Sequence, residues 1–205
     1  AHGVNRHLHI DTASRTTEKL RIISRNQQLL RADFEDPPRK EVIDRCLSDY
    51  EELLSKIDIV IISDYGKGSL QSAERMIQLA KGRGIPVVVD PKGCDFSRYR
   101  GATVITPNEL ELQGVVGPWS STAEMEDKAL DLVRQIEIDG LLVTRGKDGM
   151  ILFRLEGESL QEEARSLEVY DISGAGDTVV AMVAVGIAAR FDWKQILRFS
   201  NIAAG

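Results

Sequence analysis

Short apolar runs alternate with longer segments of helical periodicity over most of the chain. Four runs have the length and β-branched content of strands buried in a parallel sheet, and they cover residues 57–62, 85–90, 102–106 and 140–144. Two further strands are expected at 150–153 and about 166–169. Helices are expected from Pro38 to Leu54, over about 72–83, from Pro107 onward, and over about 122–136, 175–189 and 193–204. This alternation predicts an α/β fold with a mainly parallel sheet flanked by helices.

The N-terminal part of the chain has a different pattern. Residues 19–24 and 28–34 are two strand-like runs around Arg25-Asn26-Gln27, which predicts a β-hairpin. Arg21, Arg25 and Arg31 make this hairpin strongly basic. Charges on an exposed edge oppose aggregation, so the arginines can be a solvated edge. Alternatively, they belong to a lid that grips an anionic sugar phosphate through bidentate contacts.

Polar residues follow each predicted strand of the parallel sheet, where ligands bind in folds of this kind. They are Asp64 and Lys67, Asp90 and Lys92, Asn108 and Glu111, Arg145 and Gly146, and, after the last strand, Asp171 and Asp177. The connections at the opposite end also contain polar residues, so this distribution favours a site without establishing one.

The run Ser173-Gly174-Ala175-Gly176 stands between the last predicted strand and a long apolar helix. Two glycines at such a turn leave backbone N–H groups uncovered at a helix N-terminus, where negative charge is favoured. Asp177 lies in the same helical turn. An anion cradle beside a carboxylate suits the transfer of a phosphoryl group to a hydroxyl. Asp177 can equally be a helix-dipole partner without chemistry.

The glycine pattern does not fit two commoner nucleotide-binding motifs. A dinucleotide fingerprint requires a third glycine where the chain has Val179. A Walker loop requires Gly-Lys-Ser/Thr after a fixed spacing, and Gly66-Lys67-Gly68-Ser69 has the wrong order.

A second candidate motif is Asn108-x-x-Glu111, at the start of a predicted helix. This spacing places both side chains on one helix face. Their oxygens suit Mg²⁺ held largely through waters beside a nucleotide phosphate. The alternative is an N-terminal helix cap.

Composition restricts the classes of function. The 205 residues are enough for one well-buried domain, and the formal charge of −6 argues against a nucleic-acid partner. The longest apolar run, 179–189, is shorter than the ~20 residues that span a bilayer. Cys46 and Cys94 form no paired motif. We therefore expect a soluble cytoplasmic protein with no membrane or nucleic-acid partner.

Three motifs in order resemble those of the ribokinase-like (PfkB) carbohydrate kinases. The run from Asp171 to Thr178 resembles the family's C-terminal Asp-Thr-Gly-Ala-Gly-Asp signature. Thr106-Pro107-Asn108-x-x-Glu111 resembles its magnesium-associated motif, and the run from Val143 to Gly149 resembles its nucleotide-proximal strand and turn. The fold implied is ribokinase-like, with a small β-hairpin lid over residues 1–36 and a nucleotide-binding kinase core over residues 37–205.

The resemblance also implies roles for individual residues and the use of ATP and Mg²⁺. Asp177 would be the base on the sugar hydroxyl, with the amides of Gly174, Ala175 and Gly176 as the anion hole. Asn108 and Glu111 would organise Mg²⁺. The expected nucleotide-binding residues are Thr144, Gly146, Asn108 and Asn201, and the expected substrate-binding residues are Arg25, Arg31 and Lys92.

Within the family, residues 23–33, 63–68 and 90–101 resemble the bacterial heptose-phosphate kinases. The implied reaction is phosphorylation of the anomeric hydroxyl of D-glycero-β-D-manno-heptose 7-phosphate in ADP-heptose synthesis, by a homodimer joined through its lids. The family's Gly-Gly-rich sugar-binding stretch and closing segment are not found, so we expect an incomplete domain. A kinase of another sugar and a nucleotide-binding fragment without turnover remain alternatives.

Overall fold

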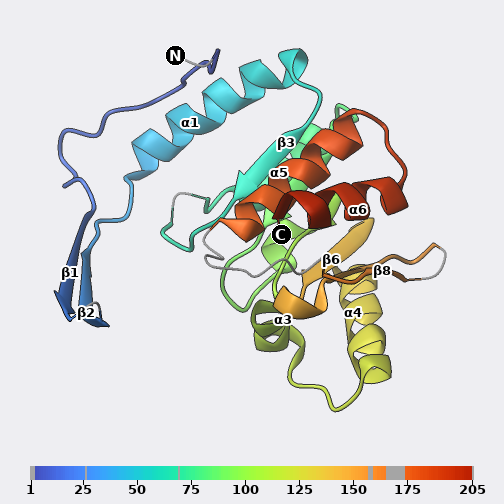
Figure 1. Cartoon of the computed structure of the whole chain (residues 1–205). Helices are drawn as coiled ribbons and strands as arrows, with labels where there is room; N and C mark the ends of the chain where they lie inside the picture. Colours follow the sequence, from blue (N-terminus) through green and yellow to red (C-terminus); the bar gives the residue numbers. More distant parts are fainter. Residues whose placement is uncertain (1–2, 26, 69, 157–158, 165–173, 205) are drawn as a thin grey trace.

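Figure 1 shows the computed structural model, which describes residues 3–25, 27–68, 70–156, 159–164 and 174–204. The strands are β1 Glu18–Ser24, β2 Gln27–Phe34, β3 Val60–Ser63, β4 Val87–Asp90, β5 Val104–Ile105, β6 Gly140–Thr144, β7 Met150–Phe153 and β8 Leu160–Glu162. The α-helices are α1 Lys40–Leu53, α2 Ala73–Lys81, α3 Glu109–Val116, α4 Thr122–Ile136, α5 Ala175–Ala188 and α6 Trp193–Ala204. Three short 3-10 helices are η1 Leu54–Lys56, η2 Ser97–Tyr99 and η3 Gly146–Asp148.

A six-stranded sheet in the order β3-β4-β5-β6-β7-β8 forms the centre of the protein. Strands β3 to β6 are parallel, whereas β7 and β8 are antiparallel additions at one side. The carboxyl ends of the four parallel strands therefore share one edge of the sheet. A bridge between Asn108 and Thr144 extends the pairing at this edge beyond β5 and β6. The mainly parallel α/β fold predicted from the sequence is confirmed.

Alternate side chains of the strands enter two separate cores, as the twofold period of a strand requires. Val87, Val89, Leu141 and Val143 pack with buried residues of α2, α3 and α4. Val88, Val104 and Leu142 belong to the other core, where they pack with buried residues of α5 and α6. In Figure 1 α5 and α6 cross in front of the sheet, so one helical layer carries the glycine turn over the sheet edge.

Strands β1 and β2 form the predicted hairpin, which is antiparallel and stands apart from the six-stranded sheet (Figure 1). The register places Leu20 opposite Ala32 and Ile22 opposite Leu30, so these side chains share one face. Arg21 lies opposite Arg31 on the other face. Most residues of both strands are exposed, including the apolar ones. The hairpin thus presents one apolar and one basic face.

Most of the predicted elements have the observed positions, and the bounds of β6, β7, α4 and α6 agree residue for residue. Strands β3 and β5 are shorter than predicted because their ladders with β4 extend only over 60–63 and 104–105. Strand β8 was not predicted. The strand expected at 166–169 lies outside the described residues. In the described ranges, no helix combines the length and the apolar character needed to cross a membrane.

Candidate functional site

The glycine turn opens α5 at the carboxyl edge of the sheet. Gly174 is the N-cap residue with a left-handed backbone (φ 83°), and its carbonyl oxygen accepts hydrogen bonds from the N–H and Oγ1 of Thr178, each at 2.9 Å. A Cβ atom added at Gly174 or Gly176 would meet nothing within 4 Å, so the turn faces open space in the described structure. The first N–H groups of a helix lack intrahelical acceptors and can donate to an anion. Asp177 is exposed in this first turn.

Asp90, the last residue of β4, lies among other carboxylates. Its pKa is raised to about 6, first by burial and then by the negative charges of Glu111 and Asp177, whereas the Lys92 ammonium acts in the opposite direction. Ser63 Oγ lies 3.5 Å from one carboxylate oxygen. Because the charges of Asp177 and Glu111 both act on Asp90, α5 and α3 place these two carboxylates near the end of β4. Sequence reasoning placed Asp90 at a strand end but gave it no role.

Asn108 and Glu111 form a capping box at the start of α3. Asn108 Oδ1 accepts the Glu111 N–H at 2.9 Å, and Glu111 Oε2 accepts the Asn108 N–H at 3.0 Å. The capping alternative is therefore correct as a description of the local structure. The other Glu111 oxygen, Oε1, accepts a hydrogen bond from Lys92 Nζ at 2.5 Å. Lys92 is thus part of the same edge as Asp90 and Glu111.

This edge has the donor chemistry for a hydrated divalent cation. Asp90, Glu111 and Asn108 offer hard oxygen atoms, and the pKa of Asp90 is raised by burial and then by the negative charges of Glu111 and Asp177. Across the described ranges, no three His, Cys, Asp or Glu side chains lie close enough to hold a metal ion by themselves. A Mg²⁺ ion fits this edge only if water and phosphate oxygens complete its coordination.

Thr144 and Gly146 lie beside the cap of α3. Thr144 is the last residue of β6, and its N–H donates to the Pro107 carbonyl oxygen at 3.0 Å. Gly146 begins η3 with a φ of 55° and is exposed. The turn ends at Gly149, whose added Cβ would lie 2.0 Å from the Glu162 carbonyl oxygen. Glycine is therefore required at 149, because β8 passes directly over it.

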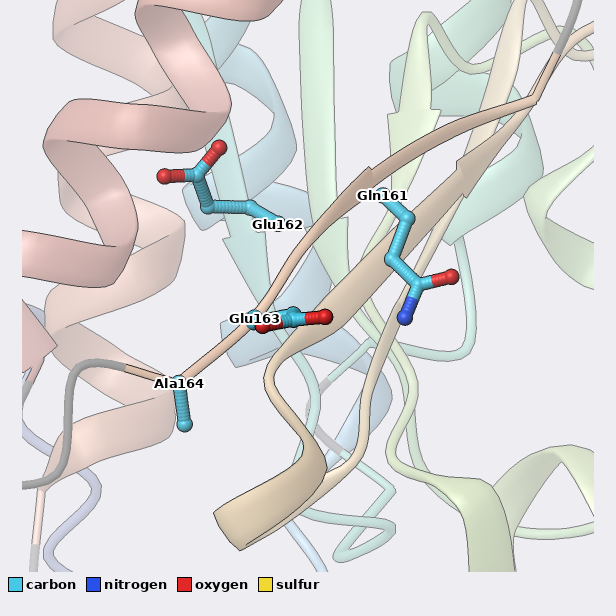
Figure 2. A pocket seen from close by; sticks show the side chains of 4 residues that line it. All are labelled: Gln161, Glu162, Glu163 and Ala164. Carbon is cyan, nitrogen blue, oxygen red and sulfur yellow. The ribbon is translucent and has the colours of Figure 1, made fainter.

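Asn201 is buried in α6. Its Nδ2 donates to the Glu163 carbonyl oxygen at 2.6 Å, which ties α6 to the segment after β8. That segment lines an open hollow of about 550 Å³ formed by Gln161 to Ala164. Figure 2 shows the Glu162 side chain extending toward the helices in this view, and the Gln161 side chain extending away from them.

The structure does not bring the two predicted hairpin arginines to this edge. Arg25 lies in the hairpin turn with a φ of 47°, and Arg31 is held by Asp33 through a bidentate ion pair. The Asp33 carboxylate raises the pKa of Arg31 through these hydrogen bonds. Asp177, Glu111 and Lys92 are therefore assembled by the core, whereas Arg25 and Arg31 belong to a separate unit (Figure 1).

Comparison with known proteins gives one consistent family. The family model described as pfkB family carbohydrate kinase matches residues 1–205. The chain is 45% identical over 205 residues to the "Bifunctional protein HldE" of Stutzerimonas stutzeri, and 44% identical over 203 residues to the protein of the same name of Coxiella burnetii (strain Dugway 5J108-111). These alignments cover 100% and 99% of the chain but 43% of each relative. The chain thus spans less than half the length of these relatives.

Solved structures share the fold at lower identity. Phosphofructokinase-2 from Escherichia coli, in complex with potassium, matches with a TM-score of 0.71 and 21% identity, covering 85% of the chain and 59% of that protein. Ribokinase from Arabidopsis thaliana, complexed with ribose and ATP, matches with a TM-score of 0.70 and 22% identity, covering 87% and 59%. The fold is ribokinase-like, and the described domain corresponds to part of those chains, as the sequence predicted.

The burial of Asp90 beside like charges predicts a pH-dependent effect on stability. Because the folded protein holds the Asp90 proton more tightly than the unfolded chain, Asp90 favours the folded state below about pH 4 and loses this contribution as the pH rises to about 6. Asp90→Asn is therefore expected to be more stable than the wild type at pH 7, with a difference that shrinks toward pH 4. Urea unfolding of both proteins from pH 4 to pH 7 measures it. A difference that stays constant over this range would contradict the assignment.

Proposed function

Because the chain belongs to the pfkB family of carbohydrate kinases, we propose that it is the kinase core of an ATP-dependent sugar kinase. The proposed reaction transfers a phosphoryl group from ATP to the anomeric hydroxyl of D-glycero-β-D-manno-heptose 7-phosphate, in ADP-heptose synthesis for the lipopolysaccharide core. The observation that carries this proposal is the glycine turn of α5, with Asp177 beside it and with Asp90 within range of the charges of Asp177 and Glu111. The similarity to proteins named HldE over the whole chain supports the sugar.

In this mechanism, the first turn of α5 acts on the transferred group. The amides of Gly174, Ala175 and Gly176 stabilise negative charge that develops on the phosphoryl oxygens, with the helix dipole aiding them. The Asp177 carboxylate accepts the proton of the attacking hydroxyl. Both functions come from one helical turn, so the acceptor hydroxyl and the phosphoryl group are held next to each other.

Mg²⁺ is the metal that the edge residues suit. Asp90, Asn108 and Glu111 would hold it, largely through water, beside the nucleotide phosphates. When bound, it supplies charge neutralisation to the phosphate oxygens. The chain's own contribution is to bury Asp90 within range of the charges of Glu111 and Asp177, which raises the pKa of Asp90.

The remaining residues are assigned to binding. Thr144 and Gly146, with Asn108, would border the nucleotide at the end of β6, and Asn201 would border it from α6 beside the hollow of Figure 2. Lys92 would contact an anionic substrate group. Arg25 and Arg31 would reach the sugar phosphate only after the lid, residues 1–36, moves toward the core, residues 37–205. Arg31 would then exchange Asp33 for the substrate phosphate.

The apolar face of the hairpin supports a homodimer joined through the lids. Leu20, Ile22 and Leu30 share this face and are 53%, 45% and 54% exposed. An exposed apolar face on a two-stranded ribbon is unfavourable in water, and a second copy of the same hairpin would cover it. The proposed setting is the cytoplasm, with small molecules as the other partners.

The Asp177 role predicts a large kinetic effect. In the full-length gene product, Asp177→Asn is expected to lower kcat by roughly 10²–10⁴-fold while the affinity for Mg-ATP survives, because only proton transfer is lost. Steady-state kinetics and calorimetry measure the two quantities. Asp192→Asn is the matched control, since Asp192 is an exposed acid that caps α6, and asparagine caps equally well. Unchanged turnover in Asp177→Asn would remove Asp177 from the mechanism.

A substrate panel separates the alternatives. Sugars with and without a terminal phosphate are assayed for ATP consumption with the 205-residue chain and with the full-length gene product. The proposal expects turnover of the heptose 7-phosphate and a preference for phosphorylated sugars. Turnover of a different sugar instead would favour another kinase of the same family. Binding of Mg-ATP without turnover of any sugar by either protein would favour a nucleotide-binding fragment without activity.

The lid dimer predicts an effect of charge on assembly. Leu30→Lys places an ammonium group in the apolar face and is expected to convert the dimer to a monomer in sedimentation velocity experiments. Gln27→Lys adds the same charge at the hairpin turn and is expected to leave the dimer intact. A monomeric wild-type protein, or equal dissociation of both variants, would exclude assembly through this face.

A further inference from the structure

Asp64 is a buried carboxylate that the proposed mechanism does not use. Asp64 directly follows β3 and is 2% exposed. Its Oδ1 accepts the Gly66 N–H at 2.8 Å, and its Oδ2 accepts the Tyr99 hydroxyl at 2.8 Å. Arg98 Nη2 lies 3.4 Å from the same Oδ2. A buried charge is costly unless it is paired and fully hydrogen-bonded, as Asp64 is here.

The Tyr99 hydroxyl connects this carboxylate to the turn after β4. It donates to Asp64 and accepts the backbone N–H of Lys92 at 3.2 Å. Tyr99 is fully buried, and burial raises its pKa to about 12, so the hydroxyl keeps its proton at neutral pH. The ring is fixed by Phe96, whose centroid lies 5.8 Å away, and by the guanidinium of Arg98 at 5.6 Å.

Two further contacts concern the Lys92 side chain itself. A Cβ atom added at Gly66 would lie 3.7 Å from Lys92 Cγ, so the turn held by Asp64 Oδ1 passes against the lysine stem. The far end of the stem donates from Nζ to Glu111 Oε1. Asp64 therefore acts on both sides of Lys92, through Tyr99 on its backbone and through Gly66 on its side chain.

We propose that Asp64 and Tyr99 are positioning residues, which hold the turn at 91–93 so that the Lys92 ammonium stands beside Glu111, ready for an anionic substrate group. This inference rests on the proposed function, because it gives Lys92 a substrate to contact. The alternative is an ion pair between Asp64 and Arg98 that stabilises the core and has no effect on the position of Lys92.

Hydrogen exchange of the full-length gene product without substrates tests the contact. Tyr99→Phe keeps the ring and removes the hydroxyl, so the Lys92 amide loses its acceptor and is expected to exchange about fivefold faster or more. Tyr50→Phe is the matched control, since it also removes one tyrosine hydroxyl with one hydrogen bond, to the Met76 carbonyl oxygen, in another part of the core. Unchanged exchange at Lys92 in Tyr99→Phe would overturn the proposal.

A double-mutant cycle tests the consequence. Tyr99→Phe is expected to raise KM for the phosphorylated sugar about fivefold to tenfold while kcat changes less, because the proposed loss is in substrate binding. If Tyr99 acts through Lys92, the variant that combines Tyr99→Phe with Lys92→Met is no worse than Lys92→Met alone. Independent, multiplying losses would refute positioning. A wild-type enzyme without turnover would refute the proposed function, and the exchange result alone would then decide whether Tyr99 holds the turn.

Discussion

Burial of the Asp90 carboxylate beside two other carboxylates is the constraint on which the candidate site depends. Asp90, Glu111 and Asp177 come from a strand end, a helix cap and a second helix N-terminus. Burial, and then the charges of Glu111 and Asp177, raise the pKa of Asp90 to about 6. Stability alone does not favour this arrangement, since burial and the two neighbouring charges make Asp90 harder to ionise. Lys92 offsets part of this cost through its contact with Glu111. The arrangement is typical of a site that receives a cation and phosphate groups.

Several polar side chains at or near this edge have hydrogen-bond partners close by. Glu111 is half of the capping box at the start of α3 and is also the partner of Lys92, so one side chain has a structural contact and a contact at the candidate site. Asp64 also has two contacts of this kind. It closes a tight turn by accepting the Gly66 N–H, and it accepts the Tyr99 hydroxyl. Capping and catalysis are therefore not competing explanations for these acidic residues. Local hydrogen bonds set the side-chain geometry that chemistry at the edge requires.

The hairpin differs from the core in how little of its apolar surface is buried. Strands β4 to β7 of the six-stranded sheet are buried on both faces. The hairpin strands pair only with each other in the described structure and leave Leu20, Ile22 and Leu30 largely exposed. Arg31 satisfies its charge on Asp33 within the hairpin itself. The connection to the core contains an ion pair between Glu35 and Lys67, which joins the hairpin base to the turn after β3.

The sequence by itself determined the α/β class, the hairpin and most helix and strand positions, because hydrophobic periodicity and glycine or proline breaks are local properties. It also located the glycine turn, Asp177, Asn108 and Glu111, since each belongs to a short motif read along the chain. Strand β8 was not predicted, because a three-residue strand with one polar and one acidic residue carries no periodic signal. Only the tertiary structure decided that Asp90 stands within range of two other carboxylates, and that Tyr99 bridges Asp64 and Lys92. Those relations join residues up to 87 positions apart (from 90 to 177), and no local pattern encodes which strand ends become neighbours.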